Sequence, residues 1–250
     1  MDNDGLLAAV THEGSRFYEV ARASQRGSRV PSCPDWTIED LVAHLGKVNH
    51  WVAKVVEAGE PKEGLAFPEI PAGAAESADG VLTWAQEGFD SMIAAFRDKG
   101  PDAPCWNFRP GSARVVGWWY RRQALEAAIH RYDIEMAADL DPGDVEAGLA
   151  VEGVDEMLCD MLPMIRKRGG ATGLQGTLHL HATDAEGEWW VDLGADEPSA
   201  TREHKKADTA LRGPASGLYL WAWNRKEPAD AGLEVFGDEA IVAAWRSVTI

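Results

Sequence analysis

The sequence predicts an α+β protein in which a four-helix bundle precedes a smaller α/β domain. Apolar residues recur at helical spacing through four long segments that end near residue 141. After the glycine-rich stretch 169–173 the pattern changes, and short runs of β-forming residues alternate with short helical segments. Helices first and mixed elements later indicate two separately packed parts, so we expect domains at residues 1–141 and 142–250.

The first two helices have clear signals at their ends. The opening helix is expected to end at the turn 27–36, which contains two prolines. Thr37 then suits the N-cap of the second helix, because its hydroxyl can accept a hydrogen bond from a free backbone N–H. Asp40 favours the positive end of the helix dipole, and we expect this helix to run to about Gly59.

Two further helices complete the predicted bundle. The stretch 60–80 is rich in proline and glycine and is expected to lack regular structure. The third helix should span about 79–97, and the fourth should begin near Gly117. The sequence Asp-Pro-Gly at 141–143 then ends the fourth helix.

The second domain should open with a helix over 145–168, which Pro163 is expected to kink or end. Segments 174–183 and 188–193 flank the turn Asp-Ala-Glu-Gly and predict a β-hairpin. The elements expected after the hairpin are a strand at 207–213, a helix at 214–225, a strand at 232–237 and a helix at 238–248.

Composition narrows the classes of function. The net charge of −17, from 41 acidic and 24 basic residues, argues against binding to nucleic acid or to anionic membrane surfaces. No apolar run approaches the roughly 20 residues of a membrane-spanning helix, and no signal-peptide pattern is present. We therefore expect a cytoplasmic protein.

The three cysteines, Cys33, Cys105 and Cys159, are widely spaced and form no C-x-x-C pair. This pattern predicts neither a disulfide framework nor a thiolate zinc site. Cys33, in a turn before a helix, is the candidate for a reactive thiol, and a structural thiol is the favoured interpretation.

One sequence pattern indicates a chemically active site. Glu126 and His130 are four residues apart on the fourth predicted helix, so a rotation of only about 40° separates them. Such a pair alone is usually solvated. Here it belongs to a helical stripe flanked by apolar residues, which predicts a partly buried polar cluster in need of partners. The stripe consists of Trp119, Arg122, Glu126, His130, Asp133 and Ala137.

His44, on the apolar face of the second predicted helix, is a possible partner for this pair. Two imidazoles and one carboxylate that leave a coordination position open are typical of a reactive divalent-metal site. Asp133, one turn beyond His130, is placed to orient that imidazole. Arg122 and Trp119 are candidates for binding substrate above the metal.

Four segments, in this order, resemble motifs of the mycothiol-dependent maleylpyruvate isomerase family. They are residues 30–52, 121–139, 211–226 and 233–245. The resemblance implies a DinB-like metal-binding bundle joined to a domain similar to sterol carrier proteins. It also implies that His44, Glu126 and His130 hold a divalent metal, usually zinc, and that Arg225 contacts the substrate near the domain interface. Asn224 departs from the Gly-Arg pattern that is frequent in the family.

The same resemblance implies mycothiol as a low-molecular-weight thiol cosubstrate and a small electrophile as its partner. A thiolate that adds and then leaves after bond rotation gives cis–trans isomerisation, whereas one that remains gives S-transfer. The sequence does not choose between these outcomes and indicates no catalytic residue beyond the metal ligands. A metal-dependent hydrolase and a non-catalytic, metal-binding regulatory module remain alternatives.

The other histidines carry less information. His179 and His181 alternate on a predicted strand and share one face, but no third ligand is near them in sequence. A half-exposed strand face is therefore the favoured interpretation. His12, His50 and His204 have no specific pattern around them.

Overall fold

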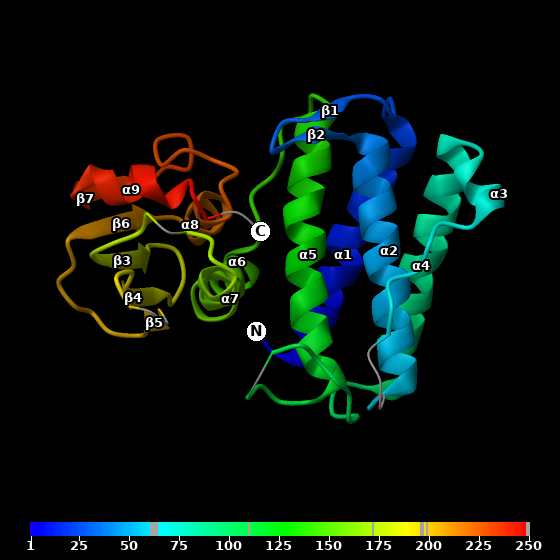
Figure 1. Cartoon of the computed structure of the whole chain (residues 1–250), viewed down its shortest axis with the longest axis horizontal. Helices are drawn as coiled ribbons and strands as arrows, with labels where there is room; N and C mark the ends of the chain where they lie inside the picture. The colour runs from blue at the N-terminus through cyan, green and yellow to red at the C-terminus, as the bar shows by residue number, and fades with distance from the viewer. Residues whose placement is uncertain (61–64, 110, 172, 196–197, 199, 249–250) are drawn as a thin grey trace. The chain divides into compact units, whose positions relative to one another are not determined.

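Four long helices make up most of the first of two compact units, Met1–Gly143 (Figure 1). The computed structural model describes every residue except 61–64, 110, 172, 196–197, 199 and 249–250. The long helices are α1 Asn3–Ala23, α2 Ile38–Ala58, α4 Ala78–Lys99 and α5 Val116–Ala137. Helix α2 packs mainly on α4, and α1 packs mainly on α5. The predicted four-helix bundle is therefore confirmed.

Helix α2 begins where the sequence placed its cap. The Thr37 hydroxyl accepts a hydrogen bond from the Asp40 backbone N–H, and the Asp40 carboxylate accepts one from the Thr37 backbone N–H. This reciprocal pair satisfies two N–H groups that would otherwise have no partner in the helix. The helix ends before Gly59, whose φ of 69° lies in the left-handed region that favours glycine.

Two short segments of the first unit differ from the expectation. The turn 27–36 contains a small hairpin of strands β1 Arg29–Val30 and β2 Cys33–Thr37, which pair antiparallel. Pro31 lies in the turn between them, and Pro34 is tolerated in β2 because each strand of a two-stranded ribbon has one free edge. The stretch 60–80, expected to be irregular, contains the short helix α3 Ala72–Ala75 and the first residues of α4, and its residues 61–64 lie outside the described chain.

A buried charge network holds α5 against α1. The Arg131 guanidinium lies 2.7 Å from Glu13 Oε2 on α1 and 2.9 Å from Glu135 Oε2 on α5. It also donates a hydrogen bond to the carbonyl of Gly143 at the end of the unit. Arg16 on α1 reaches the other oxygen of Glu135 at 2.7 Å. Since Arg131 is only 5% exposed, these partners are needed to compensate the free-energy cost of burying its positive charge.

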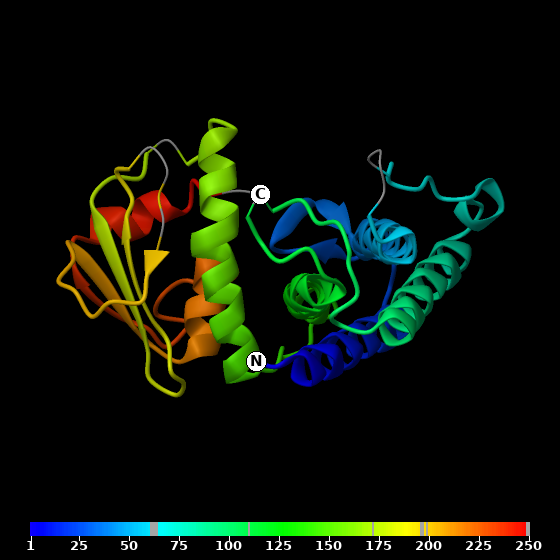
Figure 2. The same cartoon turned by 90° about the horizontal axis from the view of Figure 1, so that it is seen from below.

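The second unit, Asp144–Ile250, contains a five-stranded sheet with helices packed on one face (Figure 2). The strand order is β5-β4-β3-β6-β7, in which β3 and β6 are parallel and all other neighbours are antiparallel. Leu178 and Leu180 of β3 are fully buried, whereas the alternating His179 and His181 belong to the opposite face. The strands are β3 Thr177–Ala182, β4 Glu188–Asp192, β5 Ala200–Thr201, β6 Thr209–Gly213 and β7 Glu234–Gly237. The predicted hairpin and the two later strands are confirmed.

The first helical segment of this unit passes Pro163 without ending. Helix α6 Ala147–Glu156 continues through a π-helical turn, Met157–Met161, into α7 Leu162–Lys167. Pro163 lies in the first turn of α7. A π turn widens the helix locally, so it can accommodate a residue that has no N–H to donate. The helix therefore does not end at Pro163, and the expected kink there stays a prediction. The remaining helices are α8 Ala215–Ala222 and α9 Glu239–Trp245.

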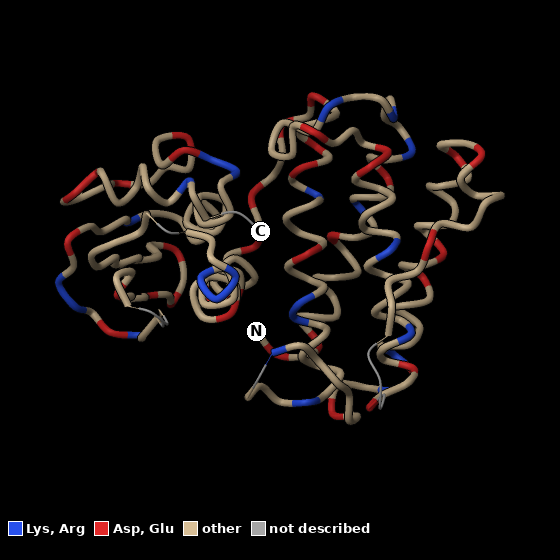
Figure 3. Tube along the Cα trace, in the orientation of Figure 1, with Lys and Arg blue, Asp and Glu red and all other residues tan. Residues whose placement is uncertain are grey.

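Acidic and basic residues are interspersed along the trace of both units (Figure 3). With a net charge of −17, the average field repels a small anion, so local arginines would have to attract one. Among the described helices, none is both long and apolar enough to cross a membrane.

The Arg131 network gives a stability prediction. Arg131→Met removes the cation that compensates two buried carboxylates, so we expect the first unit to lose about 3 kcal/mol of unfolding free energy. Denaturant unfolding followed by far-UV circular dichroism measures this loss. The matched control is Arg22→Met on the exposed face of α1, where we expect less than about 0.5 kcal/mol. Equal stability of the two variants would contradict the proposed role of the network.

Candidate metal centre

Helices α2 and α5 bring together the three side chains that the sequence singled out. His44 Nε2 on α2 lies 3.2 Å from Glu126 Oε1 on α5, and His130 Nε2 lies 3.5 Å from the same oxygen. The two imidazole centroids are 5.1 Å apart. One ligand atom from each residue lies within 4.8 Å of the other two, so a single ion could contact all three.

The donor set suits a divalent cation. Imidazole and carboxylate are ligands of zinc and neighbouring transition metals, and three of them leave room for an exogenous ligand. Glu126 and His130 are 6% and 7% exposed, whereas the His44 side chain retains 35% of its accessible surface. The cluster is therefore buried on the α5 side and accessible beside His44.

Asp133 fixes the orientation of His130. Its Oδ2 lies 3.0 Å from His130 Nδ1, and its Oδ1 accepts a 2.6 Å hydrogen bond from the Ser32 hydroxyl. With Nδ1 held by a carboxylate, the other ring nitrogen is directed at the cluster. The Asp133 contact follows the spacing seen in the sequence. Ser32, at the tip of the β1–β2 hairpin, was not anticipated, because it is 101 residues away and has no local signal.

Arg122 lies against the cluster itself. Its guanidinium donates a hydrogen bond to Glu126 Oε2, the oxygen that faces away from the histidines. Burial alone would raise the pKa of Glu126, but the charge of Arg122 and the hydrogen bonds from His130 and His44 hold it well below its usual range. Burial would likewise lower the pKa of His130, but Asp133 and Glu126 together raise it to about 9.

The aromatic residue beside His44 is Trp36 on β2. The two ring centroids are 4.9 Å apart, and sequence analysis did not single out Trp36 as a site residue. Trp119, which it did single out, is buried among Trp51, Trp106 and Trp118, and its indole N–H donates to the Trp106 carbonyl. Its role in lining a substrate pocket stays a prediction.

Arg225 belongs to the second unit, just after α8. Its guanidinium donates a hydrogen bond to the carbonyl of Trp223, and its predicted contact with substrate stays a prediction. The preceding Asn224 has a φ of 58°. Asparagine tolerates this left-handed conformation better than most residues. Asn224 can therefore adopt the backbone conformation that a glycine would favour at this position of the Gly-Arg pattern.

The cysteines lie outside this cluster. Each is a thiol and not part of a disulfide, and Cys105 is buried while Cys33 and Cys159 are half-buried. Burial raises the pKa of the Cys105 thiol to about 11 despite an opposing interaction with Trp119. A thiol in that environment is largely protonated at neutral pH and is a poor nucleophile.

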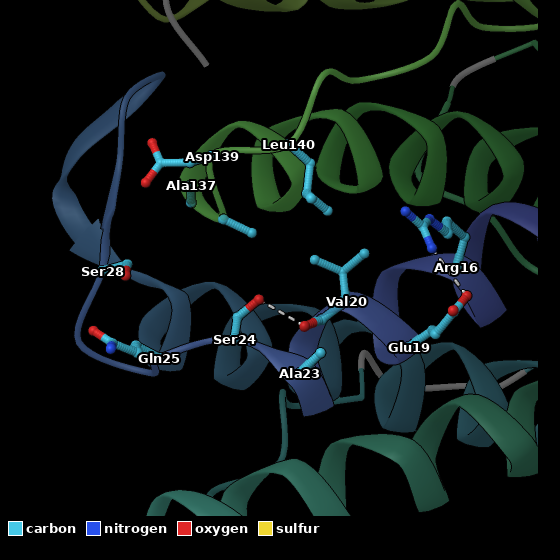
Figure 4. Close-up of a pocket in the computed structure, with 11 residues that line it drawn as sticks. Arg16, Glu19, Val20, Ala23, Ser24, Gln25, Ser28, Ala137, Asp139 and Leu140 are labelled. Carbon is cyan, nitrogen blue, oxygen red and sulfur yellow. Dashed lines mark hydrogen bonds and ion pairs between the residues drawn. The ribbon is translucent and has the colours of Figure 1, made fainter.

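A separate surface pocket of about 550 Å³ lies between α1 and the C-terminal end of α5 (Figure 4). Its lining includes Arg16, Glu19 and Asp139 but no histidine or cysteine. Arg16 and Glu19, one turn apart on α1, form an ion pair at 3.1 Å on one side of it. This pocket has no ligand set for a transition metal.

Comparison with known proteins gives two family matches and a shared fold. The model of the mycothiol maleylpyruvate isomerase N-terminal domain matches residues 7–135, and that of the MDMPI C-terminal domain matches residues 148–244. The chain is also similar to the crystal structure of the mycothiol-dependent maleylpyruvate isomerase and to that of a histidine-to-alanine mutant. Each is 14% identical, with a TM-score of 0.63 and 90% of both chains covered. At this identity the likeness concerns the fold. No curated protein sequence matches the chain.

The Asp133 contact can be tested without metal. Asp133→Asn removes the negative charge beside His130 Nδ1, so we expect the His130 pKa to fall from about 9 by at least about one unit. Imidazole NMR titration of chelator-treated protein measures this change. Asp139→Asn, the same change at an exposed position near the end of α5, should leave the His130 pKa unaltered. An unchanged value in Asp133→Asn would show that Asp133 does not control this imidazole.

Proposed function

This chain belongs to the mycothiol maleylpyruvate isomerase family, and on that premise we propose that it is a metal- and mycothiol-dependent enzyme acting on a small electrophile. The observation that carries the proposal is the convergence of His44, Glu126 and His130 on one point. These three residues are our proposed metal ligands. The cytoplasmic location expected from the sequence stays a prediction.

Zinc is the proposed metal because two imidazoles and a carboxylate form one of its usual catalytic ligand sets. When bound, such a cation lowers the pKa of a coordinated thiol or water, making the deprotonated form available at neutral pH. Two neutral histidines and one carboxylate leave a net positive charge on the site, which favours an anionic sulfur ligand over a neutral one.

The chain's own residues prepare this site in three ways. Asp133 and Ser32 hold the His130 ring so that Nε2 faces Glu126. Arg122 binds Glu126 Oε2, so Oε1 remains available for the contacts with the two histidines. The Arg122 guanidinium also places positive charge next to the site, where it can attract an anionic substrate in an otherwise acidic protein.

Two outcomes are chemically available for the thiol. In isomerisation, a C–S bond forms at one carbon of a double bond, rotation occurs about the resulting single bond, and the same C–S bond breaks. The thiol is then returned. In S-transfer the C–S bond persists, and one thiol is consumed for each product formed. We place isomerisation first, following the family, and S-transfer to an electrophilic small molecule second.

The metal ligands can be tested by composition. We expect His130→Ala to lose about one equivalent of zinc relative to wild-type protein purified without a tag, because removing one of three ligands abolishes tight binding. Elemental analysis measures the metal content. The matched control is His12→Ala, an exposed histidine on α1, which should retain all of it. Unchanged zinc in His130→Ala would remove the basis of the proposal.

The source of the nucleophile can be tested with a variant lacking all three cysteines. We expect turnover to depend on added mycothiol and to survive removal of the cysteines, since Cys105 is buried and none of the three belongs to the cluster. Product formation is compared with and without mycothiol at matched zinc content. Equal rates without the thiol would favour a metal-dependent hydrolase. A folded, zinc-loaded but inactive variant would indicate a cysteine nucleophile.

The fate of the thiol then separates the two proposed reactions. An isomerase leaves the mycothiol concentration unchanged over many turnovers, whereas an S-transferase consumes one thiol per product. Absence of turnover with every electrophile tried, at full zinc content, would favour a metal-binding regulatory module instead.

A further inference from the structure

A second histidine cluster lies in the second unit, on the sheet face opposite the buried leucines of β3. His179 and His181 are two residues apart on β3 and therefore share this face. Glu188, the first residue of β4, is paired directly opposite His181 in the antiparallel register. His204 comes from the segment that connects β5 to β6. No sequence pattern connects His204 with the other two histidines.

One carboxylate oxygen is the centre of this cluster. Glu188 Oε1 lies 2.9 Å from His179 Nε2 and 3.2 Å from His181 Nδ1, and it is also hydrogen-bonded to His204 Nδ1. The rings of His179 and His204 meet edge to face, with centroids 5.3 Å apart. One ligand atom each from His179, Glu188 and His204 lies within 4.8 Å of the other two.

Hydrogen bonds to Glu188 Oε1 alone satisfy the three histidines of this cluster poorly. A single carboxylate oxygen offers about two lone-pair directions, yet three imidazole nitrogens converge on it. A divalent cation among these groups would let each neutral imidazole use a nitrogen lone pair, while the carboxylate supplies negative charge. Two or three histidines with one carboxylate form a ligand set suited to zinc and the neighbouring transition metals.

The basic groups near this cluster have other partners. Arg202 binds Asp155 and lies 4.6 Å from the centroid of the Trp189 ring. The Lys205 ammonium lies 3.7 Å above the Trp190 ring. Arg212, paired with His181 in the β3–β6 register, forms an ion pair with Glu234 at 3.0 Å. The ion pairs of Arg202 and Arg212 reduce the repulsion that a bound cation would meet.

We propose that His179, Glu188 and His204 form a second divalent transition-metal site. The site is separate from the cluster on α2 and α5 and does not depend on the proposed enzymatic function. It is accessible to ions, because the His204 side chain is 80% exposed and a hollow of about 650 Å³ beside the cluster is lined by His181, Glu188 and Arg202. Since His204 lies outside the sheet strands, a bound ion would link the segment before β6 to β3 and β4.

Zinc stoichiometry of the full chain tests the proposal, measured by native mass spectrometry and isothermal titration. Wild-type protein should bind about two ions, and His204→Ala and His130→Ala should each bind about one. The double variant should bind none. His12→Ala is the control for an unspecific surface histidine. Because His204 is exposed, its replacement should leave the fold intact, which circular dichroism verifies.

Glu188→Gln separates a metal site from a hydrogen-bonded cluster. The amide oxygen can still accept hydrogen bonds from the imidazoles, but it carries no charge, so we expect zinc affinity at this site to fall at least about tenfold. In wild-type protein, zinc should also slow trypsin cleavage after Arg202, Lys205 and Lys206, and this protection should vanish in His204→Ala. Equal zinc affinity in wild type and His204→Ala, or in wild type and Glu188→Gln, would overturn the proposal.

These variants also separate this proposal from the enzymatic one. Loss of the ion in His204→Ala with normal zinc at His130 supports the second site, whatever the activity. Loss of one ion in His130→Ala, with no loss in His204→Ala, supports the ligands on α2 and α5 and rejects the second site.

Discussion

The buried carboxylate of Glu126 is the constraint on which the rest of the first unit depends. An ionised carboxylate that is 6% exposed in a helical bundle is costly unless charged or hydrogen-bonding partners surround it. Arg122 compensates one oxygen, and the imidazoles of His44 and His130 compensate the other. Because His44 is on α2 and the other groups are on α5, this compensation also fixes how the two helices face each other. The same groups that make Glu126 tolerable form the proposed metal centre.

Helix α5 carries two charge clusters that point to different neighbours. His130 faces α2, whereas the next residue, Arg131, binds Glu13 on α1. Successive residues on a helix are about 100° apart, so one helix can serve both sides. The Arg131 network secures α5 to α1, and that fixed position lets His130 be directed at His44 with little freedom. Stability and site geometry are therefore coupled through a single helix.

The two histidine clusters of this chain differ in how they are supported. The first rests on the packed helices α2 and α5, and Asp133, itself fully buried, orients one of its rings. Such support favours a preorganised site with one coordination position left for a reactant. The second combines a rigid β-hairpin with an exposed residue from a connecting segment, His204. A metal there would order that segment, which suits a structural role better than a reactive one.

The sequence by itself determined the parts of this protein that depend on local periodicity. The relation of Glu126, His130 and Asp133 follows from helical spacing, the cap at Thr37 from residue type, and the β3–β4 hairpin from alternation around a turn. Only the tertiary structure decided which distant groups meet these elements. Ser32 contacts Asp133, and His204 contacts Glu188, although the members of each pair are distant in the sequence. The π turn before Pro163 depends on how a long helix accommodates its proline. The physical reason is that backbone geometry fixes neighbours within an element, whereas contacts between elements depend on packing of the whole unit.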